Sequence, residues 1–150
     1  MVLWRISNYA DLQGRGGLIG SGRWHTRGRP IVYLAESPAG ALIEALVHLE
    51  LTQASLPDAY QLLKVNVPRS VRTERLNARR LGPELTDLAN ESRRIADEWL
   101  ERRSTALLRV PSAVVPESWN WLLNPLHPQS KRLRIVWARQ YRWDSRLHPA

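Results

Sequence analysis

Three side chains with complementary chemistry lie close together in the first third of the sequence. Arg23 follows a glycine, Tyr33 stands in the middle of an apolar run, and Glu44 interrupts a second apolar run. An arginine can hold a phosphate through two parallel hydrogen bonds, and an aromatic ring can stack on a heterocyclic base. A carboxylate can stabilise a developing positive charge. Together they indicate a site for a phosphorylated ligand that carries a ring.

Arg5 and Ser112 are two further candidates for this site. Arg5 interrupts an apolar strand, so it either lies at a sheet edge or points its guanidinium into a polar site. Ser112 stands between two apolar strand pieces without the Gly-x-Ser-x-Gly turn of a hydrolase nucleophile. Taken singly, each candidate also has an ordinary structural explanation: a solvated arginine, a core tyrosine, a satisfied hydroxyl or a solvent-facing helix position.

The local sequence pattern places the first candidates on defined elements. It predicts strands over residues 2–6 and 31–35, and between them an ordered, glycine-rich loop over residues 7–22, close to a ligand. A helix is expected over residues 38–51, with Ser37 as its N-cap, a proline in its first turn and apolar residues at helical spacing. The turn, the strand and the helix would therefore carry Arg23, Tyr33 and Glu44 respectively.

The rest of the sequence alternates strands with one long helix. A break at residues 81–83 precedes an exposed helix over residues 84–104, which is acidic early and basic late, as the helix dipole prefers. Strands are expected over residues 60–67, 106–115 with an interruption at residues 111–112, 121–123 and 133–143. Short strands and two helices at uneven spacing favour a compact α+β fold, with central mixed or antiparallel sheets and flanking helices.

Composition limits the class of protein further. A chain of 150 residues is expected to form a single domain over residues 1–150. The net charge is +8, and all but two of the 22 basic residues are arginine. Such a surface attracts nucleic acid, nucleotides or an acidic protein, although a codon bias toward arginine would give the same composition.

Several kinds of chemistry are excluded or disfavoured. The absence of cysteine excludes disulfides and thiol catalysis. The histidines lack the spacing of metal ligands, so no metal site is predicted. No apolar run reaches the length of a membrane span and the N-terminus lacks a secretory pattern, so we expect no membrane association and a cytoplasmic protein.

As a combination, these pieces resemble the RES domain, the toxin of RES–Xre bacterial toxin–antitoxin systems. The resemblance covers essentially the whole chain. It is carried by Leu3-Trp4-Arg5-Ile6, Gly22-Arg23-Trp24, Val32-Tyr33-Leu34-Ala35-Glu36-Ser37, Ala41-Leu42-Ile43-Glu44, Val110-Pro111-Ser112-Ala113-Val114-Val115-Pro116 and Asn120-Trp121-Leu122-Leu123-Asn124-Pro125-Leu126-His127-Pro128. One departure is His25, where many members of this family have asparagine, so the role of this position stays open.

The resemblance implies an ADP-ribosyltransferase-like α+β fold and an enzyme with NAD as its substrate and no metal. Arg23, Tyr33 and Glu44 would be the central catalytic set. Arg5 and Ser112 would line the same pocket, and Arg5, Arg23, Tyr33 and Ser112 would bind NAD. The family also implies an Xre-type, DNA-binding antitoxin that blocks the active site, and a homodimer of the toxin within that complex would be compatible with it.

The chemistry of NAD cleavage agrees with these assignments. Breaking the nicotinamide–ribose bond builds positive charge on the sugar, as in glycoside cleavage, and Glu44 would stabilise it. Arg5 and Arg23 would hold the pyrophosphate, Tyr33 would stack on nicotinamide, and Ser112 would orient the ribose or the carboxylate. The acceptor would be water, inorganic phosphate or a protein side chain, and we place depletion of free NAD first.

Two rival functions remain at this point. One is ADP-ribosylation of a specific protein. The other is a nucleic-acid-binding module, which the charge and the seven tryptophans would suit. The tryptophans are scattered rather than interleaved with a basic stripe, and Trp99 and Trp137 stand at spacings that suit core packing.

Overall fold

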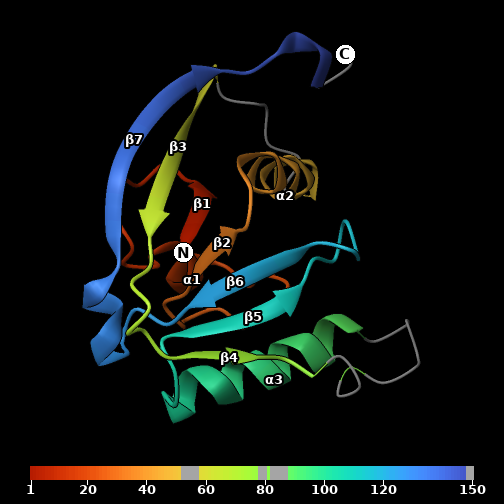
Figure 1. Ribbon diagram of the computed structural model, residues 1–150. Coiled ribbons are helices and arrows are strands. Elements are labelled where there is room, and N and C mark those ends of the chain that lie inside the picture. Colours follow the sequence, from red (N-terminus) through yellow and green to blue (C-terminus); the bar gives the residue numbers. More distant parts are fainter. Residues whose placement is uncertain (52–57, 78–80, 82–87, 148–150) are drawn as a thin grey trace.

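A seven-stranded sheet organises the chain (Figure 1). The computed structural model describes residues 1–51, 58–77, 81 and 88–147. The strand order is β4-β5-β6-β2-β1-β3-β7, and every neighbouring pair is antiparallel except β4 with β5. The strands are β1 (Val2–Ile6), β2 (Val32–Ala35), β3 (Ala59–Asn66), β4 (Thr73–Arg75), β5 (Leu107–Pro111), β6 (Trp119–Leu123) and β7 (Arg134–Arg142). The sheet is therefore mixed and the fold is α+β, as the sequence predicts.

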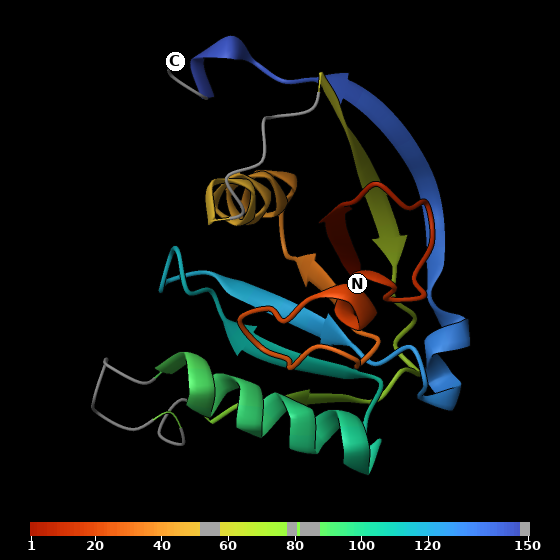
Figure 2. The ribbon, with the colours of Figure 1, turned by 180° about the vertical axis from the view of Figure 1, so that it is seen from behind.

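The helices lie beside different parts of the sheet. In Figure 1, α2 (Pro38–Leu51) stands beside β1 and β2, and α3 (Leu88–Arg102) runs along β4 and β5. Figure 2 shows the segment between β1 and β2, which includes α1 (Gly16–Ile19), in front of β6 on the side where α3 lies. Two short 3-10 helices, η3 (Pro128–Arg132) and η4 (Ser145–Leu147), flank β7.

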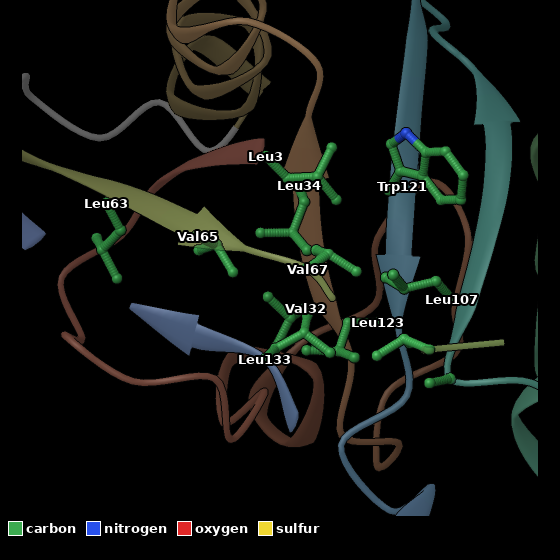
Figure 3. Packing of buried hydrophobic residues seen from close by; sticks show 12 residues of the cluster. Leu3, Val32, Leu34, Leu63, Val65, Val67, Leu107, Trp121, Leu123 and Leu133 are labelled. Atoms are coloured by element: carbon green, nitrogen blue, oxygen red, sulfur yellow. The ribbon is translucent and has the colours of Figure 1, made fainter. Parts of the chain in front are cut away.

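Two clusters of buried apolar residues pack against the sheet. The first contains Leu3, Val32, Leu34, Leu63, Val65, Val67, Val71, Ala106, Leu107, Trp121, Leu123 and Leu133 (Figure 3). The second lies against α3 and contains Trp24, Ile31, Leu76, Ile95, Ala96, Trp99, Leu100, Leu108, Val110 and Leu122. Side chains alternate between the faces of a strand, so Leu34 joins the first cluster while Tyr33 packs against the second.

The predictions for the elements around Glu44 are confirmed. The strands over residues 2–6 and 31–35 correspond to β1 and β2, and the helix over residues 38–51 corresponds to α2. Ser37 caps this helix, because its hydroxyl accepts a hydrogen bond from the amide of Gly40 at 3.0 Å. The cap, the proline in the first turn and the apolar spacing are local signals, which is why they could be read without the tertiary structure.

The prediction of an exposed helix over residues 84–104 was wrong about its exposure. Ile95, Ala96, Trp99 and Leu100 are buried against the second apolar cluster. Their spacing repeats every four residues, so they form one apolar stripe on a helix whose other positions are mostly charged. The expected start at residues 84–87, like the break at residues 82–83, lies outside the described residues.

The strand expected over residues 106–115 is shorter than predicted. β5 ends at Pro111, and residues 112–118 form a loop that leads into β6. β4 was not predicted at all, since three residues carry no readable alternation and the strand is formed by its parallel pairing with β5. No helix within the part of the chain that the structure describes is long and apolar enough to cross a membrane.

Candidate active site

The carboxylate of Glu44 is held between α2 and the sheet. Its Oε1 accepts a hydrogen bond from the hydroxyl of Ser112 at 2.6 Å and another from the amide Nδ2 of Asn120 at 2.8 Å. Both donors are buried, with exposed fractions of 6% and 9%. Glu44 comes from α2, Ser112 follows β5 and Asn120 lies in β6, so the tertiary fold creates this contact from three separate segments.

The hydroxyl of Ser112 has a defined orientation. Its oxygen accepts hydrogen bonds from the backbone amides of Val114 and Val115, at 3.1 and 3.0 Å. Because these two amides occupy the acceptor side of the oxygen, its single proton is donated to Glu44. The loop over residues 112–118 thereby fixes the rotation of the serine, and the serine fixes the carboxylate.

Glu44, Ser112 and Asn120 line a pocket of about 400 Å³, which is within the usual range for small-ligand sites. The remaining lining residues are Ala35, Glu36, Ser37, Ala39, Gly40, Ile43, Val115, Glu117, Ser118 and Trp119. Three lining side chains are carboxylates and none is basic. The side chains that line the pocket are therefore acidic or neutral, which suits a positively charged group, although the chain as a whole carries +8.

A cation–aromatic stack supports one wall of the pocket. The guanidinium of Arg109 donates to Oε1 of Glu36 from Nε at 2.9 Å and contacts it from a terminal nitrogen at 2.8 Å. The indole of Trp121 donates to the same oxygen at 3.0 Å. The guanidinium also lies 4.4 Å from the ring centre of Trp119, where it contributes a cation–π contact. Glu36 is thus neutralised by Arg109, which leaves Glu44 as the carboxylate with neutral donors.

Arg5 is partly buried on a central strand rather than placed at a sheet edge. β1 lies between β2 and β3, and one terminal nitrogen of Arg5 donates to the backbone carbonyl of Asp11 at 2.9 Å. Burial lowers the pKa of Arg5 to about 10, against an opposing effect of the Asp11 charge. Trp4 pairs with Ala35, which lines the pocket, so strand alternation directs the neighbouring Arg5 to the opposite face of the sheet.

Arg23 and Tyr33 belong to a second group, and neither of them lines the pocket. The hydroxyl of Tyr33 accepts a hydrogen bond from the amide of Trp24 at 3.1 Å and lies 2.7 Å from Nδ1 of His25. Burial raises the pKa of Tyr33, and the charge of Glu44 adds a smaller increase. The side chain of Arg23 is exposed, and no hydrogen bond or ion pair joins it to the described part of the chain.

The structure thus brings Glu44 and Ser112 into direct contact and joins the turn of Arg23 to Tyr33, while Arg5 lies on the other face of the sheet. Asn120 was missed as a site residue. The sequence signal for Asn120 was an amide side chain between two tryptophans in an otherwise apolar strand. Only the pairing of β6 with β2 and β5 shows that this side chain points to the pocket.

The class of protein follows from this geometry: a mixed-sheet α+β domain with an acidic pocket at the ends of β2, β5 and β6. The sequence profile of the RES domain matches residues 2–144. The chain belongs to the RES domain family.

Individual relatives cover nearly the whole chain. It is 46% identical to a protein of Pseudomonas putida named Toxin Res, over 98% of this chain and 99% of that protein. It is 35% identical to the Prs ADP-ribosylating toxin of a Sphingobium species, over 96% and 94% respectively. Among solved structures, the M. tuberculosis MbcT–MbcA toxin–antitoxin complex contains a chain of the same fold, with a TM-score of 0.73 and 16% identity, over 94% of this chain and 84% of that one.

Replacing Asn120 by alanine is expected to lower turnover at the pocket by about 10- to 100-fold, the effect of losing one hydrogen bond to a charged acceptor. Glu44 would keep Ser112 as a donor but lose the second bond that fixes its plane. Steady-state kinetics with the substrate proposed below measure the effect. Ser118→Ala is the matched control, because Ser118 also lines the pocket but does not bond Glu44. Unchanged turnover in Asn120→Ala would show that Ser112 alone orients the carboxylate.

Proposed function

We propose that this chain is the toxin of a toxin–antitoxin pair and that it destroys NAD by cleaving the nicotinamide–ribose bond. The observation that carries the proposal is the carboxylate of Glu44, oriented by Ser112 and Asn120 in a pocket lined by acidic but no basic side chains. The naming of relatives as toxins and membership of the RES domain family support it.

The acidic pocket suits the reacting end of NAD. The nicotinamide ring of the oxidised cofactor carries a positive charge, which the carboxylates of the pocket attract. When the bond between the ring nitrogen and the ribose carbon breaks, its electron pair stays on the nitrogen and the positive charge moves to the sugar. Glu44 then lies where charge develops, and because its donors already hold it, no reorientation is needed during the reaction.

The two arginines have separate places in this proposal. Arg23 has an exposed side chain, and we assign its guanidinium to the pyrophosphate. Arg5 is partly buried and bonded to the Asp11 carbonyl, so we assign it a supporting role through its charge. Tyr33 contributes its ring to the nicotinamide side of the site. The described residues contain no group of three or more histidine, cysteine, aspartate or glutamate side chains that could hold a metal, and the proposed steps involve none.

The acceptor of the ribosyl group defines the product. An oxygen nucleophile forms the new bond to the ribose carbon and gives up its proton, so water yields ADP-ribose and inorganic phosphate yields its phosphorylated counterpart. We rank hydrolysis and phosphorolysis of NAD ahead of transfer to a protein. The second candidate function is ADP-ribosylation of a protein, and the observation that favours it is the similarity to the Sphingobium protein named Prs ADP-ribosylating toxin.

We further propose a protein partner that silences the toxin in the cytoplasm, with an Xre-type antitoxin as the specific candidate. A structure of the same fold was solved as a toxin–antitoxin complex. The net charge of +8 suits an acidic segment on the antitoxin. A homodimer of the toxin within that complex is part of the same proposal. Nucleic-acid binding is less well supported, because Trp24, Trp99 and Trp121 are buried in the apolar clusters. Trp137, which was expected in the core, is only partly buried.

The test is to incubate the purified chain with NAD, with and without inorganic phosphate, and to measure both the NAD consumed and the nicotinamide released. We expect nicotinamide to appear in proportion to the NAD lost, and a requirement for phosphate would identify phosphorolysis. A parallel reaction with labelled NAD and cell extract scores transfer of the label to a protein band. Intact NAD with no labelled protein would overturn the proposal, and salt-sensitive binding to random DNA or RNA would then favour the nucleic-acid reading.

A further inference from the structure

The turn that carries Arg23 is anchored on both sides of that residue. The amide of Gly22 donates to the carbonyl of His25 at 3.0 Å, and Nε2 of His25 lies 2.8 Å from the carbonyl of Gly20. The amide of Arg27 donates to the hydroxyl of Ser21 at 2.9 Å. The backbone around Arg23 therefore has a defined path even though its side chain is exposed.

A buried histidine and a partly buried tyrosine close this turn against the sheet. A carbonyl can only accept, so Nε2 of His25 carries the proton that it donates to Gly20. In the neutral ring Nδ1 is then an acceptor, and the hydroxyl of Tyr33 donates to it at 2.7 Å while accepting from the amide of Trp24. Burial lowers the pKa of His25, which keeps the ring neutral, as this arrangement requires.

Gly22 allows the close packing of these two rings. A Cβ at this position would lie 2.6 Å from the hydroxyl oxygen of Tyr33 and 2.8 Å from Nδ1 of His25. A side chain at residue 22 would therefore push the two rings apart. The residue directly before Arg23 is small because the His25–Tyr33 contact occupies the space beside it.

Helix α3 holds the other side of the turn. Nε of Arg93 donates to the carbonyl of Gly22 at 2.7 Å. The carboxylate of Asp97 accepts from both the amide and the hydroxyl of Thr26, at 3.1 and 2.5 Å. The turn is thus fixed between β2 and α3, and the exposed side chain of Arg23 is presented from this anchored backbone.

We propose that His25 is a positioning residue: by holding the Tyr33 hydroxyl, it fixes the turn that presents Arg23 to the anionic part of NAD. This proposal rests on the proposed function. It also assigns the Tyr33 hydroxyl a new role. The proton and one acceptor position of this hydroxyl are used within the protein, so the hydroxyl acts on the turn, and we assign the ring of Tyr33 to the ligand.

The test is a double-mutant cycle between His25→Phe and Arg23→Ala. Phenylalanine keeps the buried ring but removes both hydrogen bonds. We expect the KM for NAD to rise about tenfold in His25→Phe, because a tenfold change corresponds to the net contribution of about one hydrogen bond. The change in kcat is expected to be smaller. In the Arg23→Ala background the same substitution is expected to leave KM unchanged, while the melting temperature falls by the same amount in both backgrounds.

A conservative variant and the binding constants complete the test. His25→Asn keeps a side-chain oxygen that can accept from Tyr33, so its KM for NAD should lie close to the wild-type value. An equal rise of KM in both backgrounds would show that His25 does not act through Arg23, and an unchanged KM in His25→Phe would also overturn the proposal. If the chain binds NAD without consuming it, the proposed function alone is wrong. The dissociation constants of wild type, the two single variants and the double variant for NAD would then test the role of His25. A chain that does not bind NAD would overturn both.

Discussion

Replacing Glu44 by glutamine is expected to lower NAD turnover by about 10²–10³-fold, the usual effect of removing one preorganised electrostatic group. Glutamine has the same shape, and its carbonyl oxygen can still accept from Ser112 and Asn120. What is lost is the negative charge that stabilises the cationic sugar. The release of nicotinamide by purified wild type and variant, under identical conditions, measures the effect.

Glu117→Gln is the matched control for this prediction. Glu117 also lines the pocket, but it is exposed and lies in the loop between β5 and β6. Because the two substitutions remove the same charge from the same pocket, a general change of potential would lower both activities alike. Equal loss in the two variants would therefore contradict a specific role for Glu44, whereas loss in Glu44→Gln alone would support it. Melting curves of both variants show whether either one is unfolded.

Truncating Trp99 to alanine is expected to lower the free energy of unfolding by about 3–5 kcal/mol, the range for deleting a large core aromatic side chain. Trp99 is 1% exposed and lies in the apolar cluster between α3 and the sheet. Its indole nitrogen also donates to the hydroxyl of Thr105 at 2.9 Å. Urea denaturation followed by circular dichroism gives the difference in free energy.

Two controls separate the causes of this loss. Trp99→Phe removes the hydrogen bond but keeps much of the packing, so we expect a smaller destabilisation than in Trp99→Ala. Val136→Ala truncates an apolar side chain that is 54% exposed on β7, and we expect a change within about 0.5 kcal/mol. If Trp99→Ala were no more destabilising than Val136→Ala, α3 would not be held by this cluster.

The stability of α3 also bears on the proposed activity. Arg93 and Asp97 hold the turn of Arg23, and both lie on the helix that Trp99 anchors. A variant that loosens α3 is therefore expected to raise the KM for NAD before it unfolds globally. Such an effect would come from the position of Arg23, since none of the three α3 residues lines the acidic pocket.

The sequence by itself was sufficient for β1, β2 and α2 and for the RES domain family, because these depend on signals within a few residues. The cap at Ser37 and the apolar runs are read one segment at a time, and Glu44 could be singled out within such a run. The motifs of the family preserve order along the chain, so they too need no tertiary structure.

Only the tertiary structure decided which groups meet. Ser112 reaches Glu44 because β5 ends at Pro111, where the sequence predicted only an interruption of a longer strand. Asn120 reaches Glu44 because β6 pairs with β2, and this pairing has no local signal. The sequence grouped Arg5 with the other candidates, but strand alternation turns it to the opposite face of the sheet. His25 had no assigned role until its contact with Tyr33 was visible. Side-chain contacts between distant segments depend on strand register and helix docking, and a single sequence does not state these.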